Sequence, residues 1–306
     1  MTKVRSSDGS MIDDRRGRSG GRGGGGGFPG LGGGGAGGFP FPMKAGGGLL
    51  GIIMVIAAMV LPQLLGAGSP ASSGLADGSS AQPGTETADT ALDTDLEQVL
   101  AGATIDVQDY WKTALPKFFG TEYRATKTVF FSGSTDTSCG QASAQTGPFY
   151  CPLDSLVYFD LDFLVALEKQ LIGKSTDLAQ QYIVAHEYGH HIQNLLGTNA
   201  EVQRVSQSRP DLANQYSVAL ELQADCYAGA WVRSVADRGQ LDSSSEINEA
   251  LKAAEGVGDD RIQQKTQGRV DPESWTHGSA QQRQDWFMRG YNTKDPRRCN
   301  TFDEIL

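Results

Sequence analysis

The hydrophobic and polar positions of the chain predict two long helices in its second half. From residue 178 to 197 the apolar residues recur at the three- or four-residue spacing of a helix with a buried face. Residues 175–177 offer side-chain oxygens for the first turn, and Gly197 is a typical helix end. A second helical pattern covers 211–238 and begins after Pro210, a residue that favours helix starts.

Another helix and a small sheet are expected nearer the N-terminus. Residues 94–97 form a capping box, and apolar residues between 107 and 118 lie on one face of a further helix that Pro116 would kink or end. Residues 128–132 and 156–160 are short runs of strand-forming type. They predict a small antiparallel sheet just before the 178–197 helix, although a plain structural hairpin fits the same residues. An edge strand of such a sheet could receive an extended peptide by strand addition.

Residues 49–65 are uncharged and apolar apart from Gln63, and with the glycines before them they approach the length of a bilayer span. A buried core helix would rarely lie between two low-complexity segments, and a cleaved signal peptide would not carry 48 residues before its apolar run. The next basic residue after the run is Lys112. The positive-inside rule therefore predicts a single-pass membrane protein with a cytoplasmic N-terminus and an extracytoplasmic body.

Composition divides the chain around this apolar run. Residues 1–48 contain 19 of the 40 glycines, which predicts a disordered tail, either a solvated linker or an arm that binds a partner or membrane surface. Residues 66–91 are rich in small and polar residues and predict a flexible linker. A folded domain is then expected over 92–306.

Charge argues against nucleic acid as a partner. The net charge is −10, and the seven basic and three acidic residues before Leu49 contribute +4. The uncharged 49–65 run adds nothing, so the remainder of the chain carries −14. An acidic body repels the phosphate backbone.

The chemistry of the chain is concentrated in the 178–197 helix. His186, Glu187 and His190 form an HExxH motif, in which two imidazoles four residues apart share one helix face and can bind one zinc ion. Glu187 then lies beside the metal, where a general base for a metal-bound water is needed. His191 points about 100° away from His190 and is expected to support the site from behind or to pack. The alternative is a helix with ordinary surface or core histidines.

A third zinc ligand is predicted on the 211–238 helix. Glu221 and Asp225 lie four residues apart on a face that also carries small side chains such as Ala224. Glu221 is the expected ligand, and Asp225 is expected to orient a ligating histidine through its other ring nitrogen. An exposed acidic pair is the alternative.

Four cysteines, Cys139, Cys151, Cys226 and Cys299, are candidates for two disulfides. Cys139 with Cys151 would close a short loop and leave Cys226 with Cys299, but three pairings are possible. Zinc ligation by cysteine is the rival interpretation, and the chain has no CxxC spacing to favour it.

Four longer strings around these residues resemble the bacterial putative neutral zinc metallopeptidase family. They are HEYGHHIQNLLG, ELQADCYAGAW, GDDRIQQKTQGRV and THGSAQQRQDWFMRGY, and the resemblance covers roughly residues 92–304. It implies a mainly helical α+β zincin fold of the gluzincin type, one zinc per chain on His186, His190 and Glu221, and Glu187 as base. The ExxxD spacing also resembles membrane prenyl-protein and heat-shock gluzincin proteases. By analogy with these, His277 and Arg283 would lie near the substrate.

The predicted protein is a membrane-anchored zinc endopeptidase that acts on proteins or peptides. His277 is the candidate for a second donor to the oxyanion, against a capping or packing role. Asp259 and Asp260 could bind a structural cation or form a solvated turn. Two other functions remain possible: a catalytically weak zinc-stabilised interaction module, and hydrolysis of a non-peptide amide such as cell-wall material.

Overall fold

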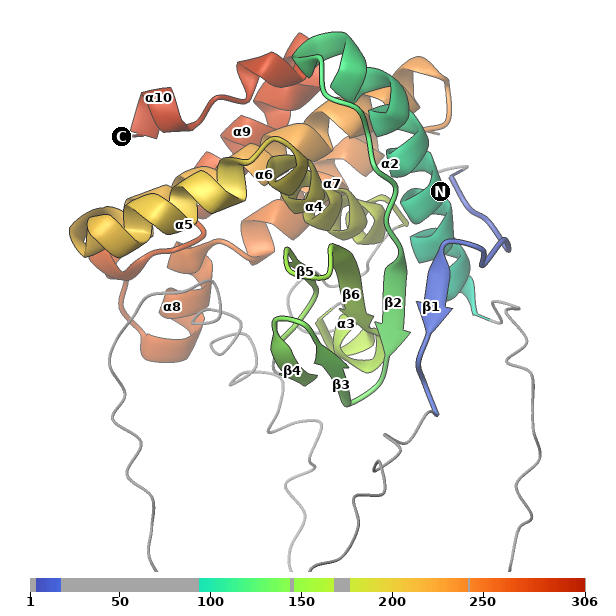
Figure 1. Ribbon diagram of the computed structural model, residues 1–306, viewed down its shortest axis with the longest axis horizontal. Helices are drawn as coiled ribbons and strands as arrows, with labels where there is room; N and C mark the ends of the chain where they lie inside the picture. Colours follow the sequence, from blue (N-terminus) through green and yellow to red (C-terminus); the bar gives the residue numbers. More distant parts are fainter. Residues whose placement is uncertain (1–3, 18–93, 144–145, 168–176, 242, 306) are drawn as a thin grey trace, which may run out of the picture.

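The computed structural model describes residues 4–17, 94–143, 146–167, 177–241 and 243–305. Helices dominate this part of the chain and gather on one side of a small sheet (Figure 1). The helices are α2 (Asp95–Phe119), α3 (Leu161–Leu167), α4 (Asp177–Leu195), α5 (Thr198–Ser208), α6 (Ala213–Asp237), α7 (Ser244–Gly256), α8 (Asp259–Gln267), α9 (Ala280–Thr293) and α10 (Phe302–Ile305). The strands are β1 (Ile12–Asp14), β2 (Thr128–Phe131), β3 (Ser134–Thr137), β4 (Gly140–Ser143), β5 (Phe149–Cys151) and β6 (Leu156–Asp160).

Helix α2 is one continuous element. The Thr94 side chain accepts a hydrogen bond from the Glu97 backbone N–H at its start. Gly120 ends the helix in the left-handed conformation, which glycine adopts without steric cost. Pro116 lies in the last turn, and the helix continues for three residues beyond it rather than ending at it. Trp111 and Leu115 are fully buried and anchor α2 in the core beneath.

Helices α4, α6 and α9 form the centre of the helical layer. They can approach closely because glycines lie where their backbones meet. A Cβ atom added at Gly189 of α4 would lie 2.9 Å from Ala224 Cα of α6, and one added at Gly229 of α6 would lie 1.9 Å from the Phe287 carbonyl oxygen of α9. Any larger side chain at these positions would push the helices apart. The small face predicted for the 211–238 helix therefore sets its distance from α4.

The sheet differs from the predicted one. Its strand order is β1-β2-β6-β5, with β1–β2 and β2–β6 parallel and β5–β6 antiparallel, while β3 and β4 form a separate antiparallel pair. The prediction of a small antiparallel sheet is therefore wrong for its centre. The chain leaves β2 through the β3–β4 hairpin and β5 before it returns in β6, and this long excursion allows β6 to run parallel to β2.

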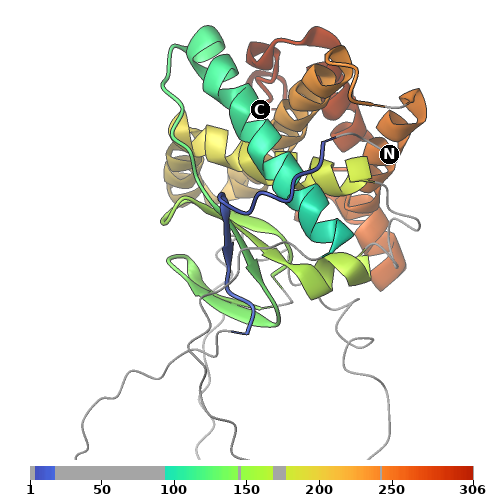
Figure 2. The same ribbon diagram turned by 90° about the vertical axis from the view of Figure 1, so that its right-hand side faces the viewer.

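The prediction of a disordered 1–48 tail is wrong for residues 4–17. Strand β1 pairs with β2, and the N-terminal segment that carries it crosses in front of α2 in Figure 2. Val4 and Ile12 are buried in the same core cluster as apolar residues of α2. The Arg5 guanidinium donates two hydrogen bonds of 2.8 Å to Asp177, and Gln181 Nε2 donates to the Val4 carbonyl at 2.6 Å. Two buried apolar residues and specific polar partners hold this segment to the domain, despite the glycines that follow it. The folded unit is thus larger than residues 92–306.

The expectation of a single-pass membrane protein is corrected by two findings. First, within the described ranges no helix combines the length and the apolar character needed to cross a membrane. Second, β1 precedes residues 49–65 and β2 follows them, yet the two strands pair in one sheet. A single crossing at 49–65 would place β1 in the cytoplasm and β2 outside it, which is incompatible with this pairing. Residues 49–65 and 66–91 themselves lie outside the described residues.

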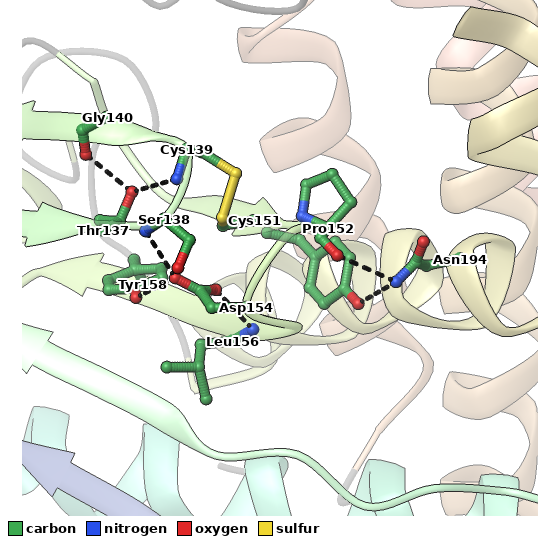
Figure 3. The surroundings of a disulfide bond; sticks show 11 residues. Thr137, Ser138, Cys139, Gly140, Cys151, Pro152, Asp154, Leu156, Tyr158 and Asn194 are labelled. Atoms are coloured by element: carbon green, nitrogen blue, oxygen red, sulfur yellow. Dashed lines mark hydrogen bonds between the residues drawn. A yellow bond between two sulfur atoms is a disulfide. The ribbon is translucent and has the colours of Figure 1, made fainter. Parts of the chain in front are cut away.

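Two disulfides stabilise the edges of the fold. Cys139 bonds to Cys151, which ties the turn between β3 and β4 to the edge strand β5 (Figure 3). Asp154 supports the same region, since its side chain accepts hydrogen bonds from the backbone N–H groups of residues 138 and 156. Cys226 of α6 bonds to Cys299 near the C-terminus. Of the three possible pairings, the structure thus contains the one that joins Cys139 to Cys151 in a short loop and Cys226 to Cys299 in a long loop.

Candidate metal centre

Helices α4 and α6 bring His186, His190 and Glu221 together. His186 Nε2 lies 3.1 Å from Glu221 Oε2, and His190 Nε2 lies 3.5 Å from Glu221 Oε1. One ligand atom from each residue falls within 4.8 Å of the other two, and all three side chains are buried. The four-residue spacing aligns the two histidines on one face of α4, and the contact at Gly189 brings α6 close enough for Glu221 to reach them.

The hydrogen bonds behind the histidines define which ring nitrogen carries the proton. His186 Nδ1 lies 2.8 Å from Asp225 Oδ1, a carboxylate that can only accept. His190 Nδ1 lies 2.8 Å from Gln193 Oε1. The Gln193 amide nitrogen donates to the Leu220 carbonyl at 2.7 Å, so its oxygen is the atom that faces His190. Both Nδ1 atoms therefore donate, and both neutral rings keep a lone pair on Nε2.

Three electron-pair donors consequently face one another in a buried space. Two imidazole lone pairs and the Glu221 carboxylate repel each other unless a proton or a metal cation lies between them. Four-coordinate zinc with bonds of about 2.0–2.1 Å places neighbouring ligand atoms about 3.4 Å apart. The observed separations of 3.1 and 3.5 Å lie on either side of that value. The donor set of two nitrogens and one carboxylate oxygen also suits zinc, so the residues fit this metal.

The pKa shifts of His186 and Glu221 also indicate that this cluster favours a positive charge. Burial alone would lower the pKa of His186, but the Asp225 and Glu221 carboxylates raise it to about 10. Burial would raise the pKa of Glu221, but the charge of His190 and then that of His277 lower it well below the ordinary value. A cation between these groups is thus favoured, and zinc would supply it in place of protons.

Asp225 connects the site to a buried polar network. Arg283 donates to it through Nε at 2.8 Å and Nη2 at 2.9 Å, and the Tyr182 hydroxyl donates to its Oδ1 atom. Burial would raise the pKa of Asp225, but the charges of Arg283 and His186 lower it to about 2, so the carboxylate stays ionised. Asp225 therefore holds the His186 ring in the orientation that directs Nε2 toward Glu221.

Arg283, which the analogy placed near the substrate, lies in the buried network behind His186. Its guanidinium donates to Asp225, to the Tyr182 hydroxyl at 3.2 Å and to the Val257 carbonyl at 3.3 Å. The residue is only 3% exposed. The structure thus places Arg283 behind His186, as the counter-charge of Asp225.

Glu187 is buried next to the ligands and has a different environment. Among the described residues its carboxylate has no hydrogen-bond partner, and burial raises its pKa, while the neighbouring His186 and His190 oppose that rise. A carboxylate with a raised pKa and free oxygens suits proton transfer at neutral pH.

His277 lies in the loop before α9, where its backbone N–H and its ring both contact Asp259. Its charge is near enough to lower the pKa of Glu221, so the loop lies on the side of the metal site. The side chain is 20% exposed, which leaves it accessible to a bound molecule.

His191 faces the sheet instead of the metal site. Its Nδ1 lies 3.1 Å from the Tyr150 hydroxyl of β5, and its Nε2 lies 2.7 Å from the Arg124 carbonyl, to which it donates. Burial lowers the pKa of His191 to about 4, so the ring is neutral. Of the two roles expected for His191, the structure shows packing, because both ring nitrogens bind groups on the other side of α4.

Two supporting residues were not identified from the sequence. Tyr182 lies four residues before His186, and Gln193 lies three residues after His190. These spacings place both side chains on the histidine face of the helix. Spacing from the motif is thus the signal that could identify both residues.

Comparisons with known proteins cover almost the whole chain. The model of the putative neutral zinc metallopeptidase family matches residues 1–302. The chain is 40% identical over 298 residues to the uncharacterized protein YpfJ of Escherichia coli K12, covering 96% of each chain. It is 46% identical over 213 residues to the uncharacterized protein Mb2605 of Mycobacterium bovis, covering 67% of this chain and 69% of that one. No solved structure matches the chain.

Proposed function

Because the chain belongs to the putative neutral zinc metallopeptidase family, we propose that it is a zinc-dependent endopeptidase with Glu187 as general base. The observation that carries the proposal is the set of three buried electron-pair donors on His186, His190 and Glu221, with the buried carboxylate of Glu187 beside them. Zinc bound there would lower the pKa of a bound water to about 7 and polarise the scissile carbonyl.

The protein side chains then transfer the proton of the attacking water and stabilise the negative charge that develops on the carbonyl oxygen. Glu187 accepts a proton from the attacking water and later delivers it to the leaving amine, a role that its raised pKa supports. His277 donates a hydrogen bond to the carbonyl oxygen as that oxygen gains negative charge. Asp225, held by Arg283, keeps the His186 ring fixed throughout.

The sheet offers a place for an extended substrate. Strand β5 is at the edge of the described sheet, and Tyr150 of β5 contacts His191 and Asn194 of α4. The edge of β5 therefore lies beside the helix that carries the metal ligands (Figure 1). A peptide that pairs with β5 would be held beside α4, the helix that carries His186 and His190.

The test is hydrolysis of fluorescently labelled casein, an unstructured protein, by the full chain loaded with one equivalent of zinc. Removal of a general base typically costs about 10²–10⁴-fold in rate, so we expect Glu187→Gln to lose activity by that factor and to retain its zinc. Glu201→Gln, which changes an exposed glutamate on α5, is the matched control and should keep full activity.

Equal hydrolysis by wild type and Glu187→Gln would contradict the proposal. A wild-type protein that binds zinc but cleaves no protein or peptide would favour the interaction module, and cleavage of cell-wall amides alone would replace the peptidase activity with an amidase activity.

A further inference from the structure

The first turn of α8 and the loop before α9 are joined by a dense set of hydrogen bonds around Asp259. Its Oδ2 atom accepts from three consecutive backbone N–H groups, those of Thr276 at 2.7 Å, His277 at 2.6 Å and Gly278 at 3.1 Å. The Asp259 N–H in turn donates to the Gly278 carbonyl at 2.9 Å. One carboxylate thus determines the backbone path of residues 276–278.

The same carboxylate contacts the imidazole of His277. Asp259 Oδ1 lies 3.4 Å from His277 Nδ1. Burial would raise the pKa of Asp259, but the hydrogen bond and charge of His277, followed by the backbone N–H groups, lower it. An ionised carboxylate can only accept, so Nδ1 is the donor and Nε2 is the nitrogen left for another partner.

Helix α6 fixes this loop relative to the metal ligands. A Cβ atom added at Gly278 would lie 3.3 Å from side-chain atoms of Val218 and Leu222, which lie on either side of Glu221 along α6. Gly278 also has a φ of +86°, a conformation that favours glycine. The loop is therefore packed onto the turn of α6 that carries the third ligand, and His277 is held beside it.

We propose that Asp259 is a positioning residue that fixes His277 with its Nε2 atom directed to the substrate carbonyl. This inference depends on the proposed peptidase function, in which His277 steadies the developing oxyanion. Asp259 has two roles. Its Oδ2 atom holds the backbone of residues 276–278, and its Oδ1 atom orients the imidazole ring of His277. With Nδ1 turned to Asp259, Nε2 is the ring atom left to face the substrate, and a ring that carries protons on both nitrogens can donate from Nε2 while Nδ1 donates to Asp259.

Asp260 provides a matched control within the same segment. Its Oδ1 atom accepts from the Ala280 backbone N–H at 2.7 Å and joins the same two pieces of chain. Asp259→Asn and Asp260→Asn therefore remove the same charge from neighbouring positions, and both keep an amide oxygen that can accept from backbone N–H groups. Of these two side chains, Asp259 is the one that contacts the His277 ring.

The experiment measures kcat and KM for casein hydrolysis by the zinc-loaded full chain, with zinc content recorded for each variant. We expect Asp259→Asn to lower kcat about 10- to 100-fold, the range for residues that orient an active group, with little change in KM. Asp260→Asn should stay within about twofold of wild type. In a His277→Ala background Asp259→Asn should cause no further loss, because a residue that acts through His277 has nothing left to position.

Three results would overturn the proposal. The first is an equal loss in Asp259→Asn and Asp260→Asn, and the second is a full additional loss when Asp259→Asn is added to His277→Ala. The third is full activity of His277→Ala while Glu187→Gln is inactive, which would leave the peptidase function standing and remove the role of His277. Failure of the peptidase function would instead appear as equal activity of wild type and Glu187→Gln.

A spectroscopic measurement on the wild type covers the case in which Asp259→Asn does not fold. The ¹⁵N spectrum of the histidine rings, assigned with His277→Ala, should show a protonated Nδ1 atom in His277 at neutral pH. A neutral ring protonated on Nε2 alone would contradict the hydrogen bond to Asp259.

Discussion

His190 and His191 are neighbours in the sequence, but they face two different regions of the molecule. On the metal-facing side of α4, His190 has one nitrogen bonded to Gln193 and directs the other toward Glu221. On the sheet-facing side, His191 has both nitrogens bonded, one to the Tyr150 hydroxyl and one to the Arg124 carbonyl. A histidine can bind a metal when one ring nitrogen donates to a neighbouring group and the other keeps its lone pair for the ion. His190 meets this condition, whereas both ring nitrogens of His191 are already hydrogen-bonded.

The largest difference between the two sides should be in zinc binding. We expect His190→Ala and Glu221→Ala to weaken zinc binding roughly a hundredfold or more, since structural zinc sites with four ligands bind with about 10–16 kcal/mol in total. His191→Ala should keep close to one zinc per chain. Zinc affinity measured by competition with a chromophoric chelator on the full chain would check this. Retention of tight zinc binding by Glu221→Ala would show that the third ligand lies elsewhere.

A smaller effect should follow from the network behind His186. Asp225→Asn removes the charge that holds the ring and leaves Arg283 buried without its partner, so zinc affinity should fall about 10- to 100-fold. Loss of the buried pair should also lower the free energy of unfolding by about 3–5 kcal/mol. Zinc competition and urea unfolding measure the two effects. Asp237→Asn, at the exposed end of the same helix, should change neither by much, and equal effects at both positions would contradict a special role for Asp225.

The smallest effect concerns the sheet-facing side and depends on pH. The unfolded chain protonates His191 near its ordinary pKa of 6.5, whereas burial holds the folded pKa at about 4. The unfolded state therefore binds more protons between these values, and stability present above pH 6.5 is lost as the pH falls toward 4. At pH 5 the loss is about 2 kcal/mol for this residue.

His191→Gln should remove this part of the pH dependence while leaving zinc content and activity at pH 7 unchanged. Urea unfolding of wild type and variant between pH 7 and 4 provides the comparison. If the two proteins lose stability in parallel as the pH falls, the buried neutral state of His191 is not the cause.

The parts of the site that could be predicted from the sequence are those set by helix geometry. The spacings of four between His186 and His190, and between Glu221 and Asp225, are local, and each helix carries its own pattern. The position of Arg283 was not predictable, because it depends on how α9 packs against α4 and α6. Asp259 was expected in a cation site or a solvated turn, and its role in holding the loop was not predictable for a similar reason, since its partners are backbone groups about 17–19 residues away.

The fold was likewise predictable where it depends on local sequence patterns, and not where it depends on pairing between distant segments. Helices α4 and α6 have strong periodic patterns, and both were identified. One parallel pair joins β1, which has three residues, to β2 across more than 100 positions of sequence, and the other joins β2 to β6 across the β3–β4 hairpin and β5. Such a pairing leaves no local pattern, and the glycines that follow β1 suggested disorder for the whole segment.

The pairing of β1 with β2 has a practical consequence for anyone who works with a shortened chain. A fragment that begins at residue 92, the boundary suggested by composition, would lack β1 and turn β2 into an open edge strand. All four residues of β2 are buried in the full structure, and three of them are apolar. A flat apolar edge with unpaired backbone groups is a template for pairing with another copy. Such a fragment would be prone to aggregate even with its metal site intact, and residues 4–17 act as the segment that protects this edge.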